Sequence, residues 1–122
     1  MDDPVFGPVI YSYSRAQAIK DGELVAVPET TSREAGYKYP VTLTRAVFEK
    51  YVKVPPGVKC QDEAGRLWDI LNMMHFGRKQ GSLCIFSLKV RGCHPPTITL
   101  KAICGPGDTA EPVLTICCME ED

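Results

Sequence analysis

The chain has 122 residues, of which 44% are hydrophobic and 24% charged, and its 14 basic and 15 acidic residues leave a net charge of -1. This length and composition are typical of a single globular domain over residues 1–122, with enough apolar residues for a core without a metal or disulfide framework. The balanced charge argues against a dedicated nucleic-acid-binding protein, because neutralising phosphates requires a basic excess.

The sequence indicates a cytoplasmic protein that does not contact a membrane. No stretch approaches the ~20 apolar residues that a membrane-spanning helix requires. The acidic start, Met1-Asp2-Asp3-Pro4, lacks the basic and apolar regions of a signal peptide. The six cysteines are therefore expected to be mostly reduced thiols.

Short elements are predicted over the first half of the chain. Ser14 and Gln17 form a capping box that starts a helix, and Gly22 ends this helix. The further predicted elements are a strand at 24–27, a helix at 29–35 and a helix at 45–52 that Thr44 caps.

The clearest predicted element is a long amphipathic helix over residues 62–79. Leu67, Ile70, Leu71 and Met74 recur at the spacing of one helical face. Arg78 and Lys79 would lie at the carboxyl end, where the helix dipole favours positive charge, and Gly81 would stop the helix.

The opposite side of this helix carries Asp62, Arg66 and Asp69 at spacings that allow ion pairs. Such pairs contribute roughly 0.3–0.5 kcal/mol each and usually mark a solvated face. The alternative is that Arg66 lines a binding site and that the two carboxylates hold it.

After Gly81 the apolar period changes to that of β-strands, which predicts three strands separated by turns at 92–96 and 105–108. The predicted fold class is therefore α+β. Short N-terminal helices and strands precede one long amphipathic helix, which packs on a C-terminal three-stranded antiparallel meander.

A register that pairs Arg91 with Thr97 and Ile103 with Val113 gives the outer face of this meander two different ends. The apolar end consists of Ile85, Ile103 and Val113, and the basic end of Ser87, Lys89, Arg91, Thr97, Thr99 and Lys101. We expect a partner to bind at Lys89, Arg91, Thr99 and Lys101. A charged face that only keeps the sheet soluble is the commoner alternative.

The cysteines predict neither a metal centre nor a catalytic one. Their spacing lacks the two close ligand pairs of structural zinc sites, and Cys60 with Cys93 and His94 makes at most a partial site. Cys84 and Cys104 are predicted to lie opposite each other, as buried thiols or, under oxidation, as a disulfide. We expect no catalytic residue, metal or cofactor.

Four strings of the sequence resemble one known family. They lie at 9–19 with 21–22, at 34–47, at 61–69, and at 100–102 with 104–108 and 111–113. The chain resembles DUF6573, a family of unknown function whose members are small proteins of phages, plasmids and bacterial genomes. The resemblance covers nearly the whole chain, with departures at 52–60 and in the cysteine-rich last strand, and it implies no activity.

The resemblance implies a context in which small mobile-element proteins act on host machinery without catalysis. We expect an anti-CRISPR-like inhibitor in the host cytoplasm, a phage protein that binds a host defence protein directly through the outer sheet face. The alternative is a sponge that sequesters a nucleotide immune signal, which a homodimer would favour. Its candidate ligand residues are Tyr11, Arg15, Tyr37, Arg45, Arg66 and Lys101. An enzyme that uses Cys93 and His94 is the third reading.

Overall fold

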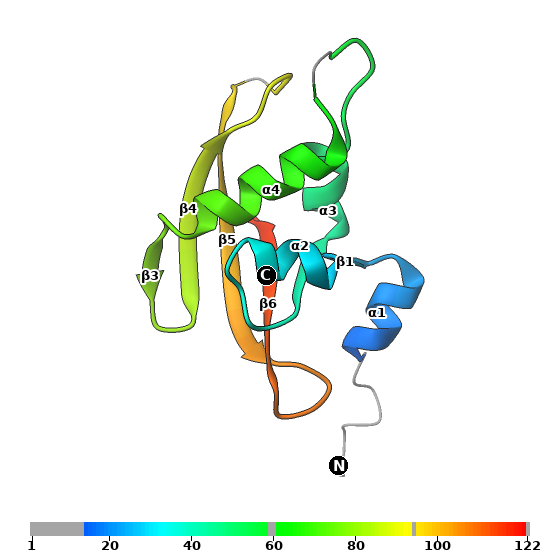
Figure 1. The fold of residues 1–122 in the computed structure, drawn as a ribbon, viewed down its shortest axis with the longest axis vertical. Coiled ribbons are helices and arrows are strands. Elements are labelled where there is room, and N and C mark those ends of the chain that lie inside the picture. The colour runs from blue at the N-terminus through cyan, green and yellow to red at the C-terminus, as the bar shows by residue number, and fades with distance from the viewer. Residues whose placement is uncertain (1–13, 59–60, 94, 122) are drawn as a thin grey trace.

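The computed structural model describes residues 14–58, 61–93 and 95–121, which form an α+β fold around a six-stranded sheet. The strands are β1 (Leu24–Ala26), β2 (Val41–Thr44), β3 (Arg78–Gln80), β4 (Leu83–Lys89), β5 (Thr97–Pro106) and β6 (Pro112–Cys118). The helices are α1 (Arg15–Asp21), α2 (Glu29–Glu34), α3 (Arg45–Val47), its π-helical continuation η2 (Phe48–Val52), and α4 (Glu63–Met74) (Figure 1). The predicted α+β class is confirmed.

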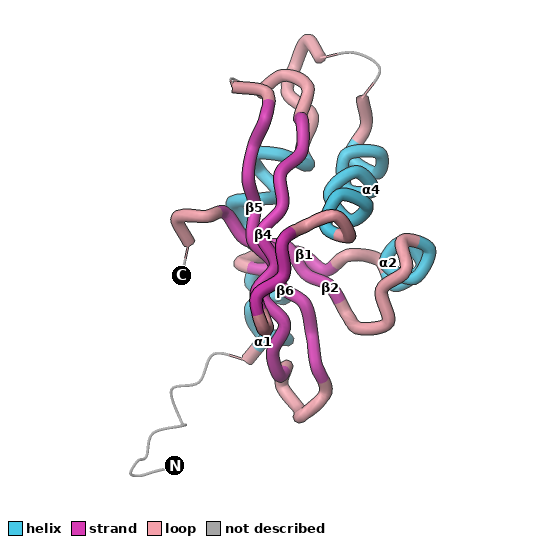
Figure 2. Tube along the Cα trace, turned by 90° about the vertical axis from the view of Figure 1, so that its left-hand side faces the viewer, coloured by secondary structure: helices cyan, strands magenta, loops and turns pink. Residues whose placement is uncertain are grey.

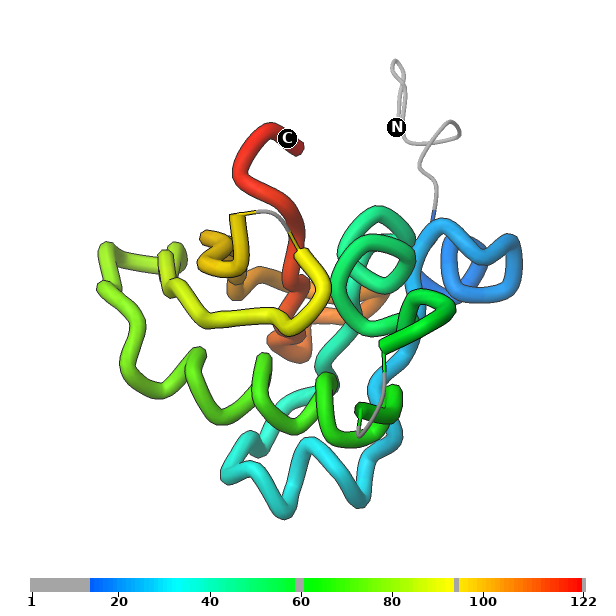
Figure 3. The backbone as a smooth tube through the Cα atoms, turned by 90° about the horizontal axis from the view of Figure 1, so that it is seen from above, coloured from blue at the N-terminus to red at the C-terminus, as the bar shows by residue number. Residues whose placement is uncertain are grey.

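The sheet is mixed, with strand order β1-β2-β6-β5-β4-β3. Among the described strands only the neighbours β2 and β6 are parallel, and the other neighbours are antiparallel. We call the face that α2 and α4 cover the inner face (Figure 2). The C-terminal segment lies on the opposite, outer face (Figure 3), where the Lys101 ammonium donates to the carbonyl of Glu121.

Three helix starts carry the side-chain caps that local sequence favours. Ser14 Oγ accepts from the Gln17 amide at 3.0 Å, as predicted. Thr44 Oγ1 accepts from the Val47 amide at 3.4 Å, and Asp62 Oδ1 accepts from the Gly65 amide at 2.6 Å. None of the described helices is long and apolar enough to cross a membrane.

The core lies between the inner face and α4. Ile70 and Leu71 of α4 are fully buried, and they belong to one apolar cluster with Phe86, Leu100 and Ile116 of the three longest strands. The predicted apolar stripe of the helix is therefore the surface that packs on the sheet.

The predicted helix over 62–79 is wrong in its extent, because α4 ends at Met74 and residues 78–80 form the edge strand β3. The reason lies at Gly77, where the chain passes very close to β4. A Cβ at this position would lie 2.5 Å from Cys84 Sγ and 2.9 Å from the carbonyl oxygen of Ile85. The basic pair Arg78-Lys79 therefore belongs to an exposed edge strand and not to a helix end.

The three-stranded meander is also wrong as a description of the sheet. Strands β4, β5 and β6 are consecutive antiparallel neighbours, but they make up only half of it. Strand β2 was not predicted, and its parallel pairing makes β6 an interior strand.

The predicted register is shifted by two residues at both hairpins. Lys89 pairs with Thr97, and Ile103 pairs with Thr115. Because side chains alternate with a period of two, this shift leaves the predicted faces unchanged. It does separate the two cysteines, since Cys84 lies opposite Ala102 and Cys104 opposite Leu114.

Candidate functional site

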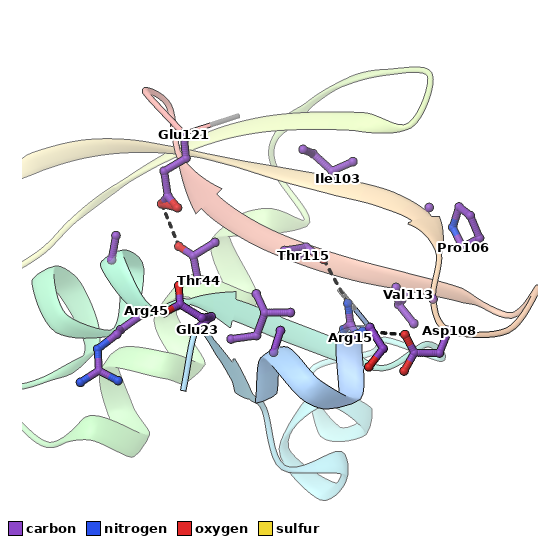
Figure 4. Close-up of a pocket in the computed structure, with 16 residues that line it drawn as sticks. Arg15, Glu23, Thr44, Arg45, Ile103, Pro106, Asp108, Val113, Thr115 and Glu121 are labelled. Carbon is purple, nitrogen blue, oxygen red and sulfur yellow. Dashed lines mark hydrogen bonds between the residues drawn. The ribbon is translucent and has the colours of Figure 1, made fainter. Parts of the chain in front are cut away.

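A pocket of about 780 Å³ opens on the outer face between α1, the start of α3, the β5–β6 hairpin and the C-terminal segment (Figure 4). Its polar lining consists of Ser14, Arg15, Glu23, Thr44, Arg45, Asp108, Thr115 and Glu121. Its apolar lining includes Leu24, Ile103 and Val113. The pocket therefore offers charged groups of both signs beside an apolar wall.

Arg15 is fixed in the pocket by the first turn of α1. Its guanidinium donates to Thr115 Oγ1 at 3.1 Å and to the carbonyl of Leu114 at 3.3 Å. Asp108, from the β5–β6 hairpin, accepts from the backbone amides of Arg15 and Ala16 at 2.6 and 2.9 Å. Burial lowers the pKa of Arg15 and Asp108 partly offsets this, but a guanidinium stays charged at any ordinary pH.

Arg45 lies at the opposite side of the pocket, at the start of α3, and is exposed. Its Nη1 donates to the carbonyl of Gly22 at 3.2 Å. Gly22 has a φ of +83°, and a Cβ there would lie 2.9 Å from the same nitrogen. The glycine thus both ends α1 and lets the arginine approach.

The carboxylate of Glu121 is a third charged group that lines the pocket, after Arg15 and Arg45. Its Oε1 accepts from the Thr44 hydroxyl at 2.8 Å and from the Cys118 amide at 2.9 Å. Burial alone would raise the pKa of Glu121, but these hydrogen bonds outweigh it and hold the pKa below its ordinary value. The C-terminal segment is thereby tied to the start of α3.

The predicted outer patch is assembled only in part. Lys89 and Thr99 are exposed on the outer face, and the Thr99 hydroxyl lies 2.9 Å from that of Ser87. Lys101 is half-buried and holds the Glu121 carbonyl, while Arg91 lies in the turn that follows β4. Ile103 belongs both to this face and to the lining of the pocket, so the two surfaces are continuous.

Of the predicted ligand residues, the structure brings Arg15 and Arg45 together in the pocket. Tyr37 lies elsewhere: its ring stacks on His75 with centroids 4.5 Å apart, and its hydroxyl donates to the carbonyl of Leu71 at 2.6 Å. Tyr11 lies outside the described residues.

The ion-pair prediction requires Arg66 to lie on a solvated helix face. Its side chain is only 4% exposed, so it does not. Its guanidinium donates to the carbonyls of Tyr51, Lys53 and Arg91. The prediction was wrong because the segment after η2 covers this side of α4, which helical spacing does not reveal.

The cysteines near the predicted partial metal site are only partly described, since Cys60 and His94 lie outside the described residues. The Cys93 thiol lies 3.9 Å from the carbonyl of Lys50. Within residues 14–58, 61–93 and 95–121, no three His, Cys, Asp or Glu side chains are placed to hold a metal ion.

Sequence reasoning missed Thr44, Asp108 and Glu121 as pocket residues. Thr44 was identified only as a helix cap, and Asp108 only as part of a turn. Both reach the pocket through contacts that are distant in sequence. Thr44 bonds to Glu121, and Asp108 accepts from the Ala16 amide at the start of α1, 92 residues away. No local pattern carries that information.

Comparison with protein families matches residues 5–122 to a family of unknown function, DUF6573. No curated protein and no solved structure matches the chain.

Proposed function

The chain belongs to the DUF6573 family, whose function is unknown, and we propose that it is a non-catalytic protein that inhibits a host defence protein by direct binding. The partner would dock on the outer face of β3, β4 and β5. A phage or mobile-element origin is part of the proposal, as is an anti-CRISPR-like role in the host cytoplasm.

The charge of these three strands is the observation that carries the proposal. On the outer face they carry Arg78, Lys89 and Lys101, and none of the three strands contains an acidic residue, although the chain as a whole has a net charge of -1. The side chains of Ser87, Lys89, Thr97 and Thr99 are exposed. A basic, hydroxyl-rich surface of this kind complements an acidic protein surface.

The apolar end of the same face supports a protein partner over a purely ionic one. Ile85 and Ile103 are half-buried and lie beside Lys101. The pocket begins at Ile103 and offers a partner side chain both apolar contact and charged groups. Interfaces commonly combine such an apolar centre with a polar rim.

The test is phage plating on bacteria that carry a defined CRISPR–Cas system and express the protein. We expect the wild-type protein to raise the efficiency of plating, and the double variant Lys89→Glu, Thr99→Glu to abolish this effect. The matched control is Lys38→Glu, Thr30→Glu, which makes the same two types of change at exposed positions in and after α2, on the other side of the sheet.

Two results would overturn the proposal. One is a wild-type protein that restores plating against none of a panel of defence systems. The other is that the Lys89→Glu, Thr99→Glu variant, the Lys38→Glu, Thr30→Glu control and the wild type all restore plating equally.

A nucleotide sponge is the second candidate, favoured by the presence of Arg15 and Arg45 in one pocket. Three carboxylates line the same pocket, and its described lining contains no aromatic side chain for base stacking. For this reason it ranks second.

Thermal-shift measurements with cyclic oligonucleotides and with ADP-ribose test the second candidate. A sponge would show a higher Tm with one of these ligands, and Arg45→Ala would remove the shift while the exposed control Lys20→Ala would keep it. The absence of a shift with every ligand would count against a sponge.

A further inference from the structure

Strand β3 pairs with only the first part of β4, along the edge of β4 that faces away from β5. Arg78 pairs with Ile85 and Gln80 with Leu83, so the pairing stops at Ile85. On that side no described strand pairs with residues 87–89, which form the upper half of β4 in Figure 1. The sheet therefore has an open edge at Ser87, Leu88 and Lys89.

The direction of the backbone groups along this edge follows from the hairpin bonds of β4 and β5. The Val90 amide donates to the carbonyl of Pro96 at 2.8 Å, and the Ser82 carbonyl accepts from the Cys104 amide at 2.8 Å. Even-numbered residues of β4 thus bond towards β5, and odd-numbered residues point away from it. The N–H and C=O groups of Ser87 and Lys89 consequently point out of the open edge.

A groove of about 490 Å³ follows this edge between α4 and β4. Asp69, Asn72 and Met73 line it from α4, and Ser87, Leu88 and Lys89 line it from β4. Met73 and Leu88 give the groove an apolar floor beside the row of backbone donors and acceptors. Edge strands with an adjoining groove are the sites at which extended peptides add to a sheet.

The alternation of side chains defines the chemistry of the added strand. A residue opposite Leu88 would point to the inner face, onto Met73 and Leu88, where an apolar side chain fits. Its two neighbours would point to the outer face, one opposite Lys89 and one opposite Ser87 and diagonal to Lys89, where acidic side chains fit. Asp69 on the α4 side disfavours acidic residues on the inner side and so reinforces this pattern.

A second copy of the chain is a poorer occupant of the same edge. Antiparallel pairing of two β4 edges about Leu88 would place Lys89 of each copy opposite Ser87 of the other, so the two Lys89 side chains would be diagonal neighbours on the same face. Like charges on neighbouring strands destabilise such a pairing. Charge complementarity therefore favours a different chain that carries acidic residues.

We propose that the open edge of β4 at Ser87–Lys89 binds an extended acidic–apolar–acidic segment of a partner protein by strand addition. The proposal concerns the sheet edge and not the outer face. It stands whether or not the partner is a defence protein.

The experiment selects a displayed library of random peptides on the wild-type protein and measures the enriched peptides by fluorescence polarisation. Two variants at one position form the matched pair. Of the backbone hydrogen-bonding groups, Ser87→Pro removes only the N–H of residue 87, which points away from β5, whereas Ser87→Ala keeps that N–H. Both lose the hydrogen bond between the Ser87 and Thr99 hydroxyls, so this loss cancels in the comparison.

We expect enriched peptides with alternating acidic and apolar residues, equal binding by wild type and Ser87→Ala, and binding weaker by about tenfold or more in Ser87→Pro. The Ser87 and Lys89 amides of the wild type should also gain protection from hydrogen exchange when peptide is added. This second measurement decides the question if Ser87→Pro fails to fold.

Three results would overturn the proposal. The first is that the wild-type protein enriches no peptide beyond those that Ser87→Pro enriches. The second is that peptide leaves the hydrogen exchange of the Ser87 and Lys89 amides unchanged. The third is that the wild type sediments as a dimer and that Ser87→Pro dissociates this dimer. The last result would assign the edge to a second copy. Because Ser87→Pro leaves every charge unchanged, its outcome is separate from that of the Lys89→Glu, Thr99→Glu variant.

Discussion

Arg66 is a buried cation whose partners are mostly backbone carbonyls. It donates to the carbonyl of Tyr51 near the end of η2, to that of Lys53 just after η2, and to that of Arg91 in the turn after β4. Its Nε also donates to Gln61 Oε1 at 3.3 Å. One side chain of α4 thus joins two loops that are distant in sequence.

Replacement of Arg66 by Met should lower the free energy of unfolding by about 2–3 kcal/mol, because buried carbonyls lose charged donors. Urea unfolding followed by far-UV circular dichroism measures the change. The control Arg33→Met removes an exposed arginine whose ion pair with Glu29 contributes at most about 1 kcal/mol. Equal midpoints for the two variants would contradict this role for Arg66.

The carboxylate of Glu121 gives the stability of the protein a specific pH dependence. Its pKa is held below the ordinary value of 4.5 by hydrogen bonds from Cys118 and Thr44, which outweigh burial. A depressed pKa stabilises the folded state above the ordinary pKa, and this contribution disappears as the pH falls through the folded-state pKa.

We therefore expect Glu121→Gln to be less stable than the wild type at pH 7, with a difference that stays constant down to about pH 5 and narrows below it. Urea unfolding of both proteins at a series of pH values measures this difference. A difference that is the same at about pH 3 as at pH 7 would show that the Glu121 carboxylate contributes nothing through its charge.

At the scale of elements, the turn from α4 into β3 depends on the absence of a side chain at Gly77. A Cβ there would collide with Cys84 Sγ and the Ile85 carbonyl. Gly77→Ala should cost about 1–3 kcal/mol through overpacking. Gly105→Ala is the control, since its Cβ would meet nothing within 4 Å. Thermal unfolding compares them, and equal Tm values would refute the role of Gly77.

The elements that sequence predicted well are those whose signals are local. The caps at Ser14, Thr44 and Asp62 lie within three residues of the amides they bind, and the first two were predicted as caps. The alternation in β4, β5 and β6 likewise predicted which residues share a face.

The elements that sequence missed depend on distant partners. Strand β2 has only four residues, and its parallel neighbour β6 follows it by about 70 positions. The pocket on the outer face is assembled from long-range pairings of the same kind, and although its two arginines were predicted as ligand residues, its carboxylates were not. Arg66 was misplaced for a similar reason, because a distant loop buries it.

At the scale of the whole molecule, β6 connects elements from both ends of the chain. It pairs with β2 on one side and β5 on the other. We expect a single cooperative unfolding transition, with coincident midpoints for Trp68 fluorescence and far-UV circular dichroism. Two separate transitions would mean that the N-terminal elements fold independently of the C-terminal strands.

The parallel pairing of β2 with β6 also has a consequence during protein synthesis. Sixty-eight positions separate Thr44 from Pro112. At about 5–20 residues per second, a ribosome needs roughly 3–14 seconds to make them. During that interval Val41, Thr42 and Leu43 have no β6 to pair with, and the nascent chain displays an apolar strand edge of the kind that chaperones bind.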